Sequence, residues 1–337
     1  MTATLIAATS PSAGRMRPLN MLRDLPAVAD LIELCFSSTL DSDSRTYIDQ
    51  MRRSGRDSGF LTWAPRVIET VSLPLSGYVW EYKGRVVGNV SLIPFFRHGQ
   101  KTFLVANVAT HPDFRRQGIA RQLTLAAMER AREKHAHAIW LHVRNDNPGA
   151  IQLYRDLGFV QRAVRTTWHA SSVIPVLDGS QKSIQIAARP ARDWPNQAEW
   201  LSRAYPLDQE WYHSQSWDVF KPGLINFIYQ LMADITTQQW SAYRNGSLQA
   251  VFSCQRANAR TDNLWAAVPN EPDGELVTAL LLHIRRSLRQ SYNLSFEYPA
   301  GVMDDAILAA GFAVQRTLAW MEAPVAATSQ SSPRRSK

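Results

Sequence analysis

The sequence predicts an α/β protein of the α+β type, made of two related domains in tandem, each a mixed, mostly antiparallel sheet flanked by helices. Its 337 residues exceed what one ordinary core encloses, which favours two domains. One order of elements is expected twice: strand, two helices, three strands, helix, strand, helix and closing strands. The stretch Gly158–Arg162 (GFVQR), with Trp168 after it, is echoed by Gly311–Arg316 (GFAVQR), with Trp320 after it. This repetition indicates an internal duplication of a domain of about 150 residues.

The first domain is predicted at residues 15–170, after a disordered tail at 1–14. Asp24 is expected to cap its first helix, with Pro26 tolerated in the first turn. The sequence Lys83-Gly84-Arg85 is typical of a turn between two strands. Strands are expected at 16–20, 77–82, 86–93, 101–110, 138–143, near 160 and at 166–169, and helices at 42–51, 118–134 and 148–157.

The second domain is predicted at 183–323, after a linker at 171–182 and before a disordered tail at 324–337. Its first helix start, Arg192–Pro195, repeats the pattern of Arg23–Pro26. Strands are expected at 184–188, 239–243, 248–253 (joined by Asn245-Gly246), 264–268 and 294–298, and helices at 274–289 and 302–310.

Composition is that of a soluble globular protein, with 45% hydrophobic and 20% charged residues. No apolar run has the length of a membrane span, so no membrane partner is expected. The apolar patch near the start lacks a preceding basic residue and does not read as a secretory signal. Cys35 and Cys254 each lie inside an apolar pattern and are expected as reduced core thiols. Together these features predict a cytoplasmic location.

The positive charge is concentrated in the first half of the chain. The net charge is +8, and residues 1–180 carry 22 Lys and Arg against 15 Asp and Glu. Such an excess favours an anionic partner. No block of five or more Lys or Arg interleaved with aromatic residues occurs, which argues against nucleic acid. A phosphorylated small molecule is compatible with this pattern.

One stretch unites a strand, a basic glycine turn and a helix start. Residues 101–110 form the strand, the polar sequence His111–Phe114 follows, and Arg115–Ala120 opens the next helix. The free backbone N–H groups and the positive dipole end of a helix N-terminus bind anions. The sequence therefore predicts a phosphate site at this turn.

Two motifs in this region resemble those of the GNAT superfamily of N-acetyltransferases. Arg115-x-x-Gly118-x-Ala120 is similar to its acyl-CoA pyrophosphate loop, and Asn147-x-x-Ala150-x-x-Leu153-Tyr154, followed by Leu157–Phe159, is similar to its second motif. The order of elements agrees over residues 15–170, and residues 182–323 resemble the same fold with weaker motifs. The resemblance implies acetyl-CoA as cosubstrate.

The resemblance also assigns residues to that cosubstrate. Backbone groups of the strand end would bind the pantetheine arm and polarise the thioester carbonyl, and the glycine turn would bind the pyrophosphate. The arginines are equally compatible with solvated surface residues, and Asn147 with a helix N-cap. The assigned residues are Val108, Ala109, Thr110, Arg115, Arg116, Gln117, Gly118, Ile119, Ala120, Arg121 and Asn147.

For catalysis, Tyr154 would donate a proton to the departing thiolate; alternatively it is a core aromatic residue. The strand at 101–110 contains no Asp or Glu to act as general base. Glu81 and His142 are the candidates, and both also suit structural roles. No carboxylate or thiol stands at metal-ligand spacing from His135, His137 and His142, so no metal is expected.

The second half departs from these motifs. Its equivalent turn, Val268–Glu275, holds three acids and two prolines and lacks the basic sequence. Ile307 and Leu308 lie near the position of the acid tyrosine. We infer that this half has lost acyl-CoA binding and completes the substrate cleft or stabilises the pair. Trp211, Tyr212 and Trp217 are candidates for lining an acceptor pocket.

The sequence thus predicts an N-acetyltransferase that transfers an acetyl group from acetyl-CoA to a primary amine, in a small molecule or a peptide. The amine would attack the thioester directly in a ternary complex, in the first domain. The alternative is a non-catalytic acyl-CoA-binding, sensing or scaffold protein. A third interpretation is an enzyme that modifies RNA or protein and docks through its basic half.

Overall fold

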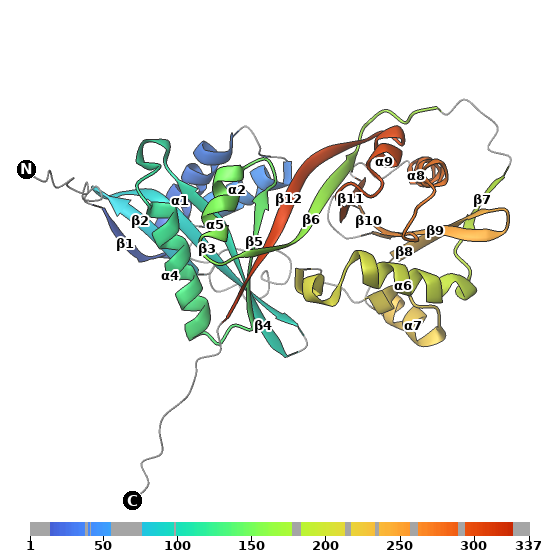
Figure 1. Ribbon diagram of the computed structural model, residues 1–337, viewed down its shortest axis with the longest axis horizontal. Helices are drawn as coiled ribbons and strands as arrows, with labels where there is room; N and C mark the ends of the chain where they lie inside the picture. Colours follow the sequence, from blue (N-terminus) through green and yellow to red (C-terminus); the bar gives the residue numbers. More distant parts are fainter. Residues whose placement is uncertain are drawn as a thin grey trace, which may run out of the picture. The chain divides into compact units, whose positions relative to one another are not determined.

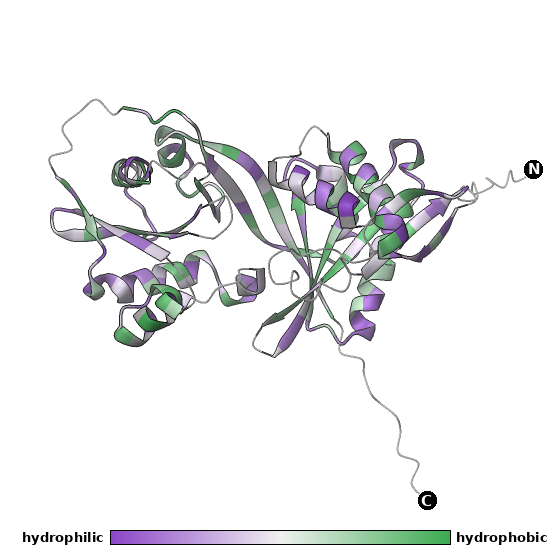
Figure 2. Ribbon diagram, turned by 180° about the vertical axis from the view of Figure 1, so that it is seen from behind, coloured by the Kyte–Doolittle hydropathy of each residue, from purple (hydrophilic) through white to green (hydrophobic). Residues whose placement is uncertain are grey.

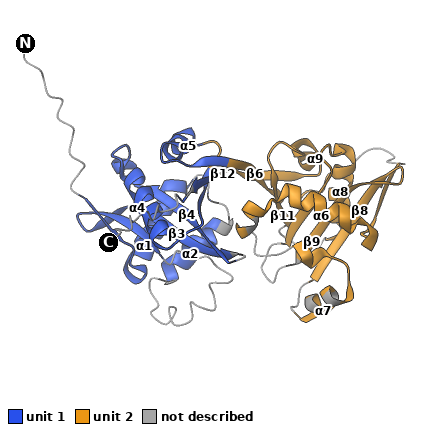
Figure 3. Ribbon diagram, turned by 60° about the horizontal axis from the view of Figure 1, so that its bottom comes forward, with its two compact units in different colours: residues 1–143, 147–161, 321–337 blue, residues 144–146, 162–320 orange. Residues whose placement is uncertain are grey.

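The computed structural model describes residues 14–37, 40, 42–54, 76–97, 99–176, 183–212, 217–232, 236–256, 262–288 and 294–325. The chain forms two compact units (Figure 3). Unit 1 comprises residues 1–143, 147–161 and 321–337, and unit 2 comprises residues 144–146 and 162–320. The predicted tails fall almost wholly outside the described residues, as does the second half of the predicted linker.

Unit 1 follows the predicted order of elements (Figure 1). Its helices are α1 (Met21–Phe36), α2 (Ser42–Ser54), α4 (Ile119–Glu133) and α5 (Pro148–Arg155), with a 3-10 turn at Pro112–Phe114. Its strands are β1 (Arg15–Pro18), β2 (Ser76–Tyr82), β3 (Arg85–Arg97), β4 (Gln100–Thr110), β5 (Ala138–Arg144) and the start of β6 (Val160–Ala170).

The sheet of unit 1 has the strand order β1-β2-β3-β4-β5, antiparallel except for the parallel pair β4–β5. Val79 packs into a core cluster with residues of α1 and α2. Trp80, the next residue, points to the other face of the sheet, beside Gly88. Helix α4 packs closely on this face, because a Cβ added to Gly88 would lie 2.8 Å from Ile119 Cγ2 of α4. Because successive strand residues point to opposite faces, α1 covers one face of the sheet and α4 the other. Figure 2 shows hydrophobic residues along the central strands between these layers.

The start of α1 differs from the prediction. Asn20, not Asp24, is the N-cap, and its Oδ1 accepts a hydrogen bond from the Arg23 N–H at 3.2 Å. Asp24 is buried one turn later and accepts hydrogen bonds from Arg17 at 2.6 and 3.0 Å. Burial alone would raise the pKa of Asp24, but its hydrogen bonds to Arg17, to the Asn20 N–H and to Arg23 lower it. The arginine of β1 recruits this carboxylate, which the local sequence does not reveal.

Unit 2 repeats the same order of elements. Its helices are α6 (Trp194–Ala204), α7 (Leu224–Met232), α8 (Gly274–Ser287) and α9 (Asp304–Ala309), with 3-10 turns at Ala191–Asp193, Leu207–Tyr212 and Trp217–Phe220. Its strands are β7 (Ile184–Ala188), β8 (Thr236–Arg244), β9 (Ser247–Arg256), β10 (Asp262–Ala267), β11 (Leu294–Pro299) and β12 (Phe312–Pro324). Buried residues of these elements form its core cluster.

The units are defined by packing, and the predicted domains 15–170 and 183–323 by sequence repetition. The two divisions differ at the closing strands: β6 belongs to unit 2 from Arg162 onward, and β12 belongs to unit 1 from Met321 onward. Within unit 2, β6 pairs antiparallel with β11, from His169 opposite Ser295 to Arg165 opposite Pro299. Each unit is therefore completed by the end of a strand from the other sequence repeat.

None of the helices described combines the length and the apolar character that crossing a membrane requires. Cys35 and Cys254 are both free thiols; Cys254 is buried and Cys35 is half-buried.

Candidate active site

The parallel strands β4 and β5 of unit 1 are paired only along their first halves. The ladder runs from Thr102 opposite Ala138 to Val105 opposite Leu141. β4 then continues to Thr110 and β5 to Arg144. Beyond the last rung, backbone groups of β4 on the β5 side have no ladder partner in the part of the chain that the structure describes, and such groups need hydrogen-bond partners. Val108, Ala109 and Thr110, assigned from the sequence to the pantetheine arm, lie on this segment.

A β-bulge interrupts β4 at the start of this segment. Asn89 of β3 pairs with Ala109 and Ser91 with Ala106, so Asn107 and Val108 stand opposite the single residue Val90. Asn107 has a φ of 51°, in the left-handed region that asparagine tolerates better than most residues. The bulge turns the strand and changes the direction of its backbone groups.

Buried hydrogen bonds fix the bulge. The Asn89 Nδ2 donates to the Asn107 carbonyl at 2.9 Å, and the Asn107 Nδ2 lies 3.1 Å from the Tyr47 hydroxyl and 3.2 Å from Ser91 Oγ. Asn89 and Ser91 are fully buried, and burial raises the pKa of Tyr47 to about 12. Sequence reasoning missed this network; an asparagine inside a strand of apolar residues was its only signal.

The turn after β4 presents the N-terminus of α4. Arg116 has a φ of 62° and Gly118, the N-cap of α4, a φ of 79°, so two left-handed residues build the turn. Gly118 supplies no capping side chain, and the first turn of α4 contains no acid. An added Cβ at Gly118 would meet only Gln122 Nε2, at 3.9 Å. The first N–H groups of α4 are thus left to an external acceptor.

The basic residues of this turn are exposed. The Arg115 Nε donates to the Thr110 carbonyl at 3.3 Å, which ties the turn to the end of β4. Arg116 and Arg121 extend the positive charge along the start of α4. Phosphate groups are stabilised by this combination of helix N-terminus and arginine charge.

Helix α5 places two predicted residues. The Asn147 Oδ1 accepts a hydrogen bond from the Ala150 N–H at 3.1 Å, so Asn147 is the N-cap of α5. Its Nδ2 is not used by that contact. Tyr154 is 7% exposed and packs edge-on against Phe159, with ring centroids 5.9 Å apart. Burial raises the pKa of the Tyr154 phenol above its ordinary value, so the hydroxyl stays protonated at neutral pH.

The structure separates the two candidates for general base. Glu81 lies on β2, where its carboxylate accepts from Arg17 Nε at 2.7 Å and pairs with Arg15 and Arg23. These arginines, above all the Arg17 hydrogen bond, lower the pKa of Glu81, which makes it a weaker base. His142 lies on β5, directly after the last rung shared with β4, and its Nε2 is shielded from solvent.

No group of three or more His, Cys, Asp or Glu residues is arranged to hold a metal ion within the described ranges.

The corresponding helix N-terminus in unit 2 is closed by the protein itself. Asp273 caps α8, with its Oδ1 3.1 Å from the Leu276 N–H. Arg244 of β8 pairs with Asp273 and with Glu275, the latter at 2.9 Å. A carboxylate already occupies the N–H groups that an anion would need, as the acidic sequence of this turn suggests.

The opening between the diverging strands of unit 2 is also filled. β10 and β11 pair in parallel only as far as Leu264 opposite Phe296. Beyond that rung the buried Tyr205 hydroxyl donates to the Glu297 carbonyl at 2.9 Å, and the Ala266 backbone hydrogen-bonds the same hydroxyl. Tyr205 therefore bridges both strands where the equivalent edge of β4 has no ladder partner.

A buried arginine and several aromatic rings complete this filling. The Arg165 Nε donates to Glu297 Oε1 at 2.7 Å, and the guanidinium lies 4.8 Å from the centre of the Tyr205 ring. Trp217 and Trp265 pack on the same ring, with centroids 5.0 and 5.3 Å away. Trp217, considered from the sequence as an acceptor contact, is thus part of the unit 2 core.

The neighbouring candidates behave in the same way. Trp211 is 7% exposed, and Tyr212 packs edge-on against Trp320 at 4.9 Å. Both rings therefore pack against Trp320, and this contact accounts for them without a ligand.

Removing the bridging hydroxyl should affect stability alone. Tyr205→Phe is expected to lower the free energy of unfolding of unit 2 by about 1–3 kcal/mol, because buried backbone groups lose their partner. If acetyl-CoA binds unit 1, as the resemblance implies, its affinity should stay within about twofold of the parent value, because unit 1 is untouched. Denaturant unfolding and calorimetry measure the two quantities; a tenfold loss of acetyl-CoA affinity would contradict the assignment of the cosubstrate to unit 1.

Comparisons with known proteins identify relatives of the chain. Residues 30–159 match the acetyltransferase (GNAT) family. The uncharacterised N-acetyltransferase YjgM of Escherichia coli (strain K12) is 31% identical over 127 residues, which cover 36% of this chain and 76% of that protein. The ribosomal protein bS18-alanine N-acetyltransferase of the same strain is 33% identical over 81 residues, 24% of this chain. The match spans about half, 51%, of that relative.

Solved structures show the same fold. A GCN5-related N-acetyltransferase from Sphaerobacter thermophilus has a TM-score of 0.55 at 15% identity, and the match covers 94% of this chain and 97% of that one. The α+β fold predicted from the sequence is confirmed. Together with the repeated order of elements, these matches show that the chain belongs to the GNAT acetyltransferase family as a tandem member.

Proposed function

We propose that the protein is an N-acetyltransferase that transfers an acetyl group from acetyl-CoA to a primary amine, with the chemistry in unit 1. One observation carries the proposal: unit 1 combines an opened strand edge with an uncapped helix N-terminus. In unit 2, Tyr205 and Asp273 occupy the equivalent positions. Acetyl-CoA is the cosubstrate of the family, and its thioester and pyrophosphate need these two kinds of donor.

The residues of unit 1 fit acetyl-CoA. The backbone of Val108–Thr110, past the Asn107 bulge, would hold the pantetheine amides and the thioester carbonyl. The N–H groups of residues 116–120 would receive the pyrophosphate, with Arg115 and Arg121 adding charge. Asn147 retains its Nδ2 for the pantetheine while its Oδ1 caps α5.

The proposed reaction is a direct transfer. A neutral amine attacks the thioester carbon, a C–N bond forms, the C–S bond breaks and the electron pair leaves on sulfur. Tyr154 donates its phenolic proton to that thiolate, and the nitrogen loses a proton to a base. The Tyr154 phenol carries its proton at neutral pH, as a general acid must, and its burial does not change this. Cys35 and Cys254 take no part.

His142 is the better candidate for the base. It adjoins the opened edge of β5, whereas Glu81 is held by three arginines that lower its pKa. The imidazole would accept a proton from an amine bound at this edge, in a position that solvent does not reach at Nε2. The named relative acts on an alanine of a ribosomal protein, so peptide N-termini belong beside small amines in the acceptor class that we propose.

Calorimetry and turnover together test the proposal. Acetyl-CoA should bind the full chain at one site, and CoA should be released when an acceptor panel of small amines and peptides with N-terminal alanine is added. Binding without release across the panel would favour the alternative, a non-catalytic acyl-CoA sensor. Absence of acetyl-CoA binding would overturn both.

A further inference from the structure

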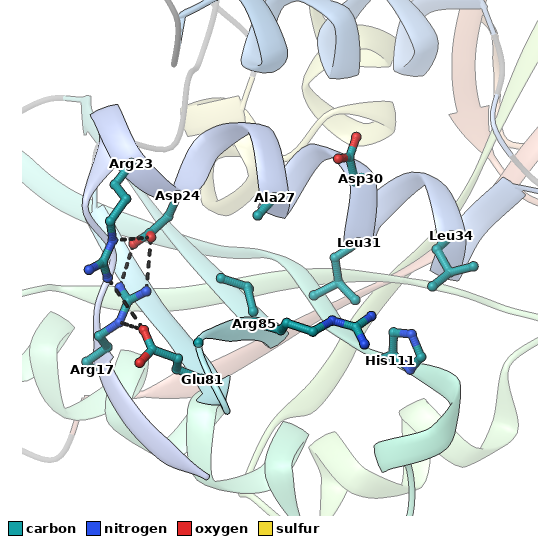
Figure 4. A pocket seen from close by; sticks show the side chains of 12 residues that line it. Arg17, Arg23, Asp24, Ala27, Asp30, Leu31, Leu34, Glu81, Arg85 and His111 are labelled. Carbon is teal, nitrogen blue, oxygen red and sulfur yellow. Dashed lines mark hydrogen bonds and ion pairs between the residues drawn. The ribbon is translucent and has the colours of Figure 1, made fainter.

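A cavity of about 560 Å³ lies in unit 1, between α1 and the hairpin of β2 and β3 (Figure 4). None of the residues assigned to acetyl-CoA lines it, and neither does Tyr154 or His142; Glu81, the weaker candidate for the base, does. His111, which follows β4 and precedes the phosphate turn, forms part of its wall. The cavity therefore adjoins the proposed active site without belonging to it.

One end of this cavity is closed by ion pairs that satisfy one another. Arg17 donates to Asp24 at 2.6 Å and to Glu81 at 2.7 Å, and Arg23 donates to Asp24 at 2.9 Å. The carboxylate of Asp24 is buried by these contacts. This end is a structural anchor between β1, β2 and α1 and offers no free charge.

The other end presents two donors. Arg85 of β3 is exposed, and its side chain makes no hydrogen bond or ion pair with the described residues. The His111 Nδ1 accepts the Asp113 N–H at 3.3 Å, so in the neutral imidazole Nε2 carries the proton and donates. Figure 4 shows the Arg85 side chain extending toward His111 beneath Leu31. A guanidinium and an imidazole N–H that converge in this way suit a carboxylate.

The wall opposite these donors is mostly apolar; the Asp30 carboxylate, which also lines it, accepts a hydrogen bond from Arg52 Nε at 2.9 Å. Ala27, Leu31 and Leu34 lie at spacings of four and three residues on α1, which places them on one face of the helix. Leu34 is 50% exposed. An apolar side chain that lines a cavity beside an unpaired cation indicates a ligand with a hydrocarbon part and a negative end.

We propose that this cavity is a second ligand site, for a small organic carboxylate with an apolar chain. Arg85 and His111 would bind the carboxylate, and Leu31 and Leu34 would contact the chain. Phe114 packs on both Tyr82 and His111, with centroids 5.0 and 5.8 Å away, so the site joins the hairpin to the segment that leads to Arg115. The proposal does not depend on the proposed acetyl transfer.

The probe is 4-methylpentanoate, followed by ligand-observed NMR on the full chain at constant ionic strength. Saturable binding is expected, and the neutral analogue 4-methylpentanamide should not bind. Arg85→Gln should weaken the carboxylate at least tenfold, because a charge-assisted hydrogen bond is lost. Lys83→Gln, on the same hairpin but outside the cavity wall, should bind like the parent protein. Equal binding by the Arg85 variant, or none by the parent, overturns the proposal.

Three further arms define the ligand and the site. Leu34→Ala should weaken 4-methylpentanoate more than acetate, because only the longer acid reaches α1. Inorganic phosphate should compete poorly; tighter binding of phosphate than of the carboxylate would show the ligand class to be wrong. Saturating acetyl-CoA should leave the probe bound, and its displacement would place Arg85 in the cosubstrate site instead. Arg85→Gln should keep the acetyl-CoA affinity of the parent protein. That result would show that the second site can be lost without loss of the proposed function.

Discussion

Replacing Tyr154 by phenylalanine is expected to lower kcat for acetyl transfer about 100- to 1,000-fold. In the proposed mechanism the phenol supplies the proton that neutralises the departing thiolate, and phenylalanine keeps the ring packed against Phe159. Acetyl-CoA affinity should stay within about twofold, because the proton is needed in the transition state and not for binding. Steady-state CoA release gives kcat, and calorimetry gives the affinity.

Tyr82→Phe is the matched control. It removes a phenol from β2 and keeps the ring that packs on Phe114, so its rate should equal that of the parent. A Tyr154→Phe variant with an unchanged kcat would remove Tyr154 from the mechanism. Tyr154 would then be a core residue, an interpretation that its burial also permits.

Gly118→Ala is expected to weaken acetyl-CoA binding at least tenfold. The φ of 79° costs an alanine about 1–2 kcal/mol. The strain can be relieved by rotating the turn, and this would move the N–H groups of Ile119 and Ala120 away from the position that we propose for the pyrophosphate. Calorimetric titration with acetyl-CoA, together with thermal unfolding of the free protein, separates loss of binding from loss of stability.

Gly246→Ala controls for the strain itself. Gly246 has the same φ of 79°, in the hairpin between β8 and β9, with no atom within 4 Å of an added Cβ. Both variants should lose similar stability, but only Gly118→Ala should lose acetyl-CoA affinity. Equal affinities in the two variants would refute the phosphate role of the turn.

The tandem arrangement has a physical consequence. Unit 2 keeps the divergence of its parallel strands but fills it with Tyr205 and Arg165, and its helix N-terminus is capped by Asp273. Groups that would bind acetyl-CoA in unit 1 are used for folding in unit 2. This favours a structural role for the second repeat over a second catalytic centre.

Much of the fold was accessible from the sequence because it is encoded locally. Hydrophobic spacing predicted α4 and α8 within a few residues, and Asn245-Gly246 predicted the hairpin of β8 and β9. The sequence predicts Asp24 as the N-cap of α1, but the cap is Asn20. The Asp24 carboxylate is not available for capping because it is paired with Arg17 on the neighbouring strand β1. Local patterns cannot report a partner on another element.

Some features of the candidate site were likewise predictable from the sequence, and others were seen only in the structure. The sequence by itself determined the family, the duplicated order of elements and the basic glycine turn at 115–120, because turn chemistry and helix starts are written in consecutive residues. Only the tertiary structure decided that Asn107 bulges out of β4, that Glu81 is held by arginines, and that Tyr205 fills the second opening. Each of these depends on contacts between residues far apart in the chain, which folding brings together and no local pattern records.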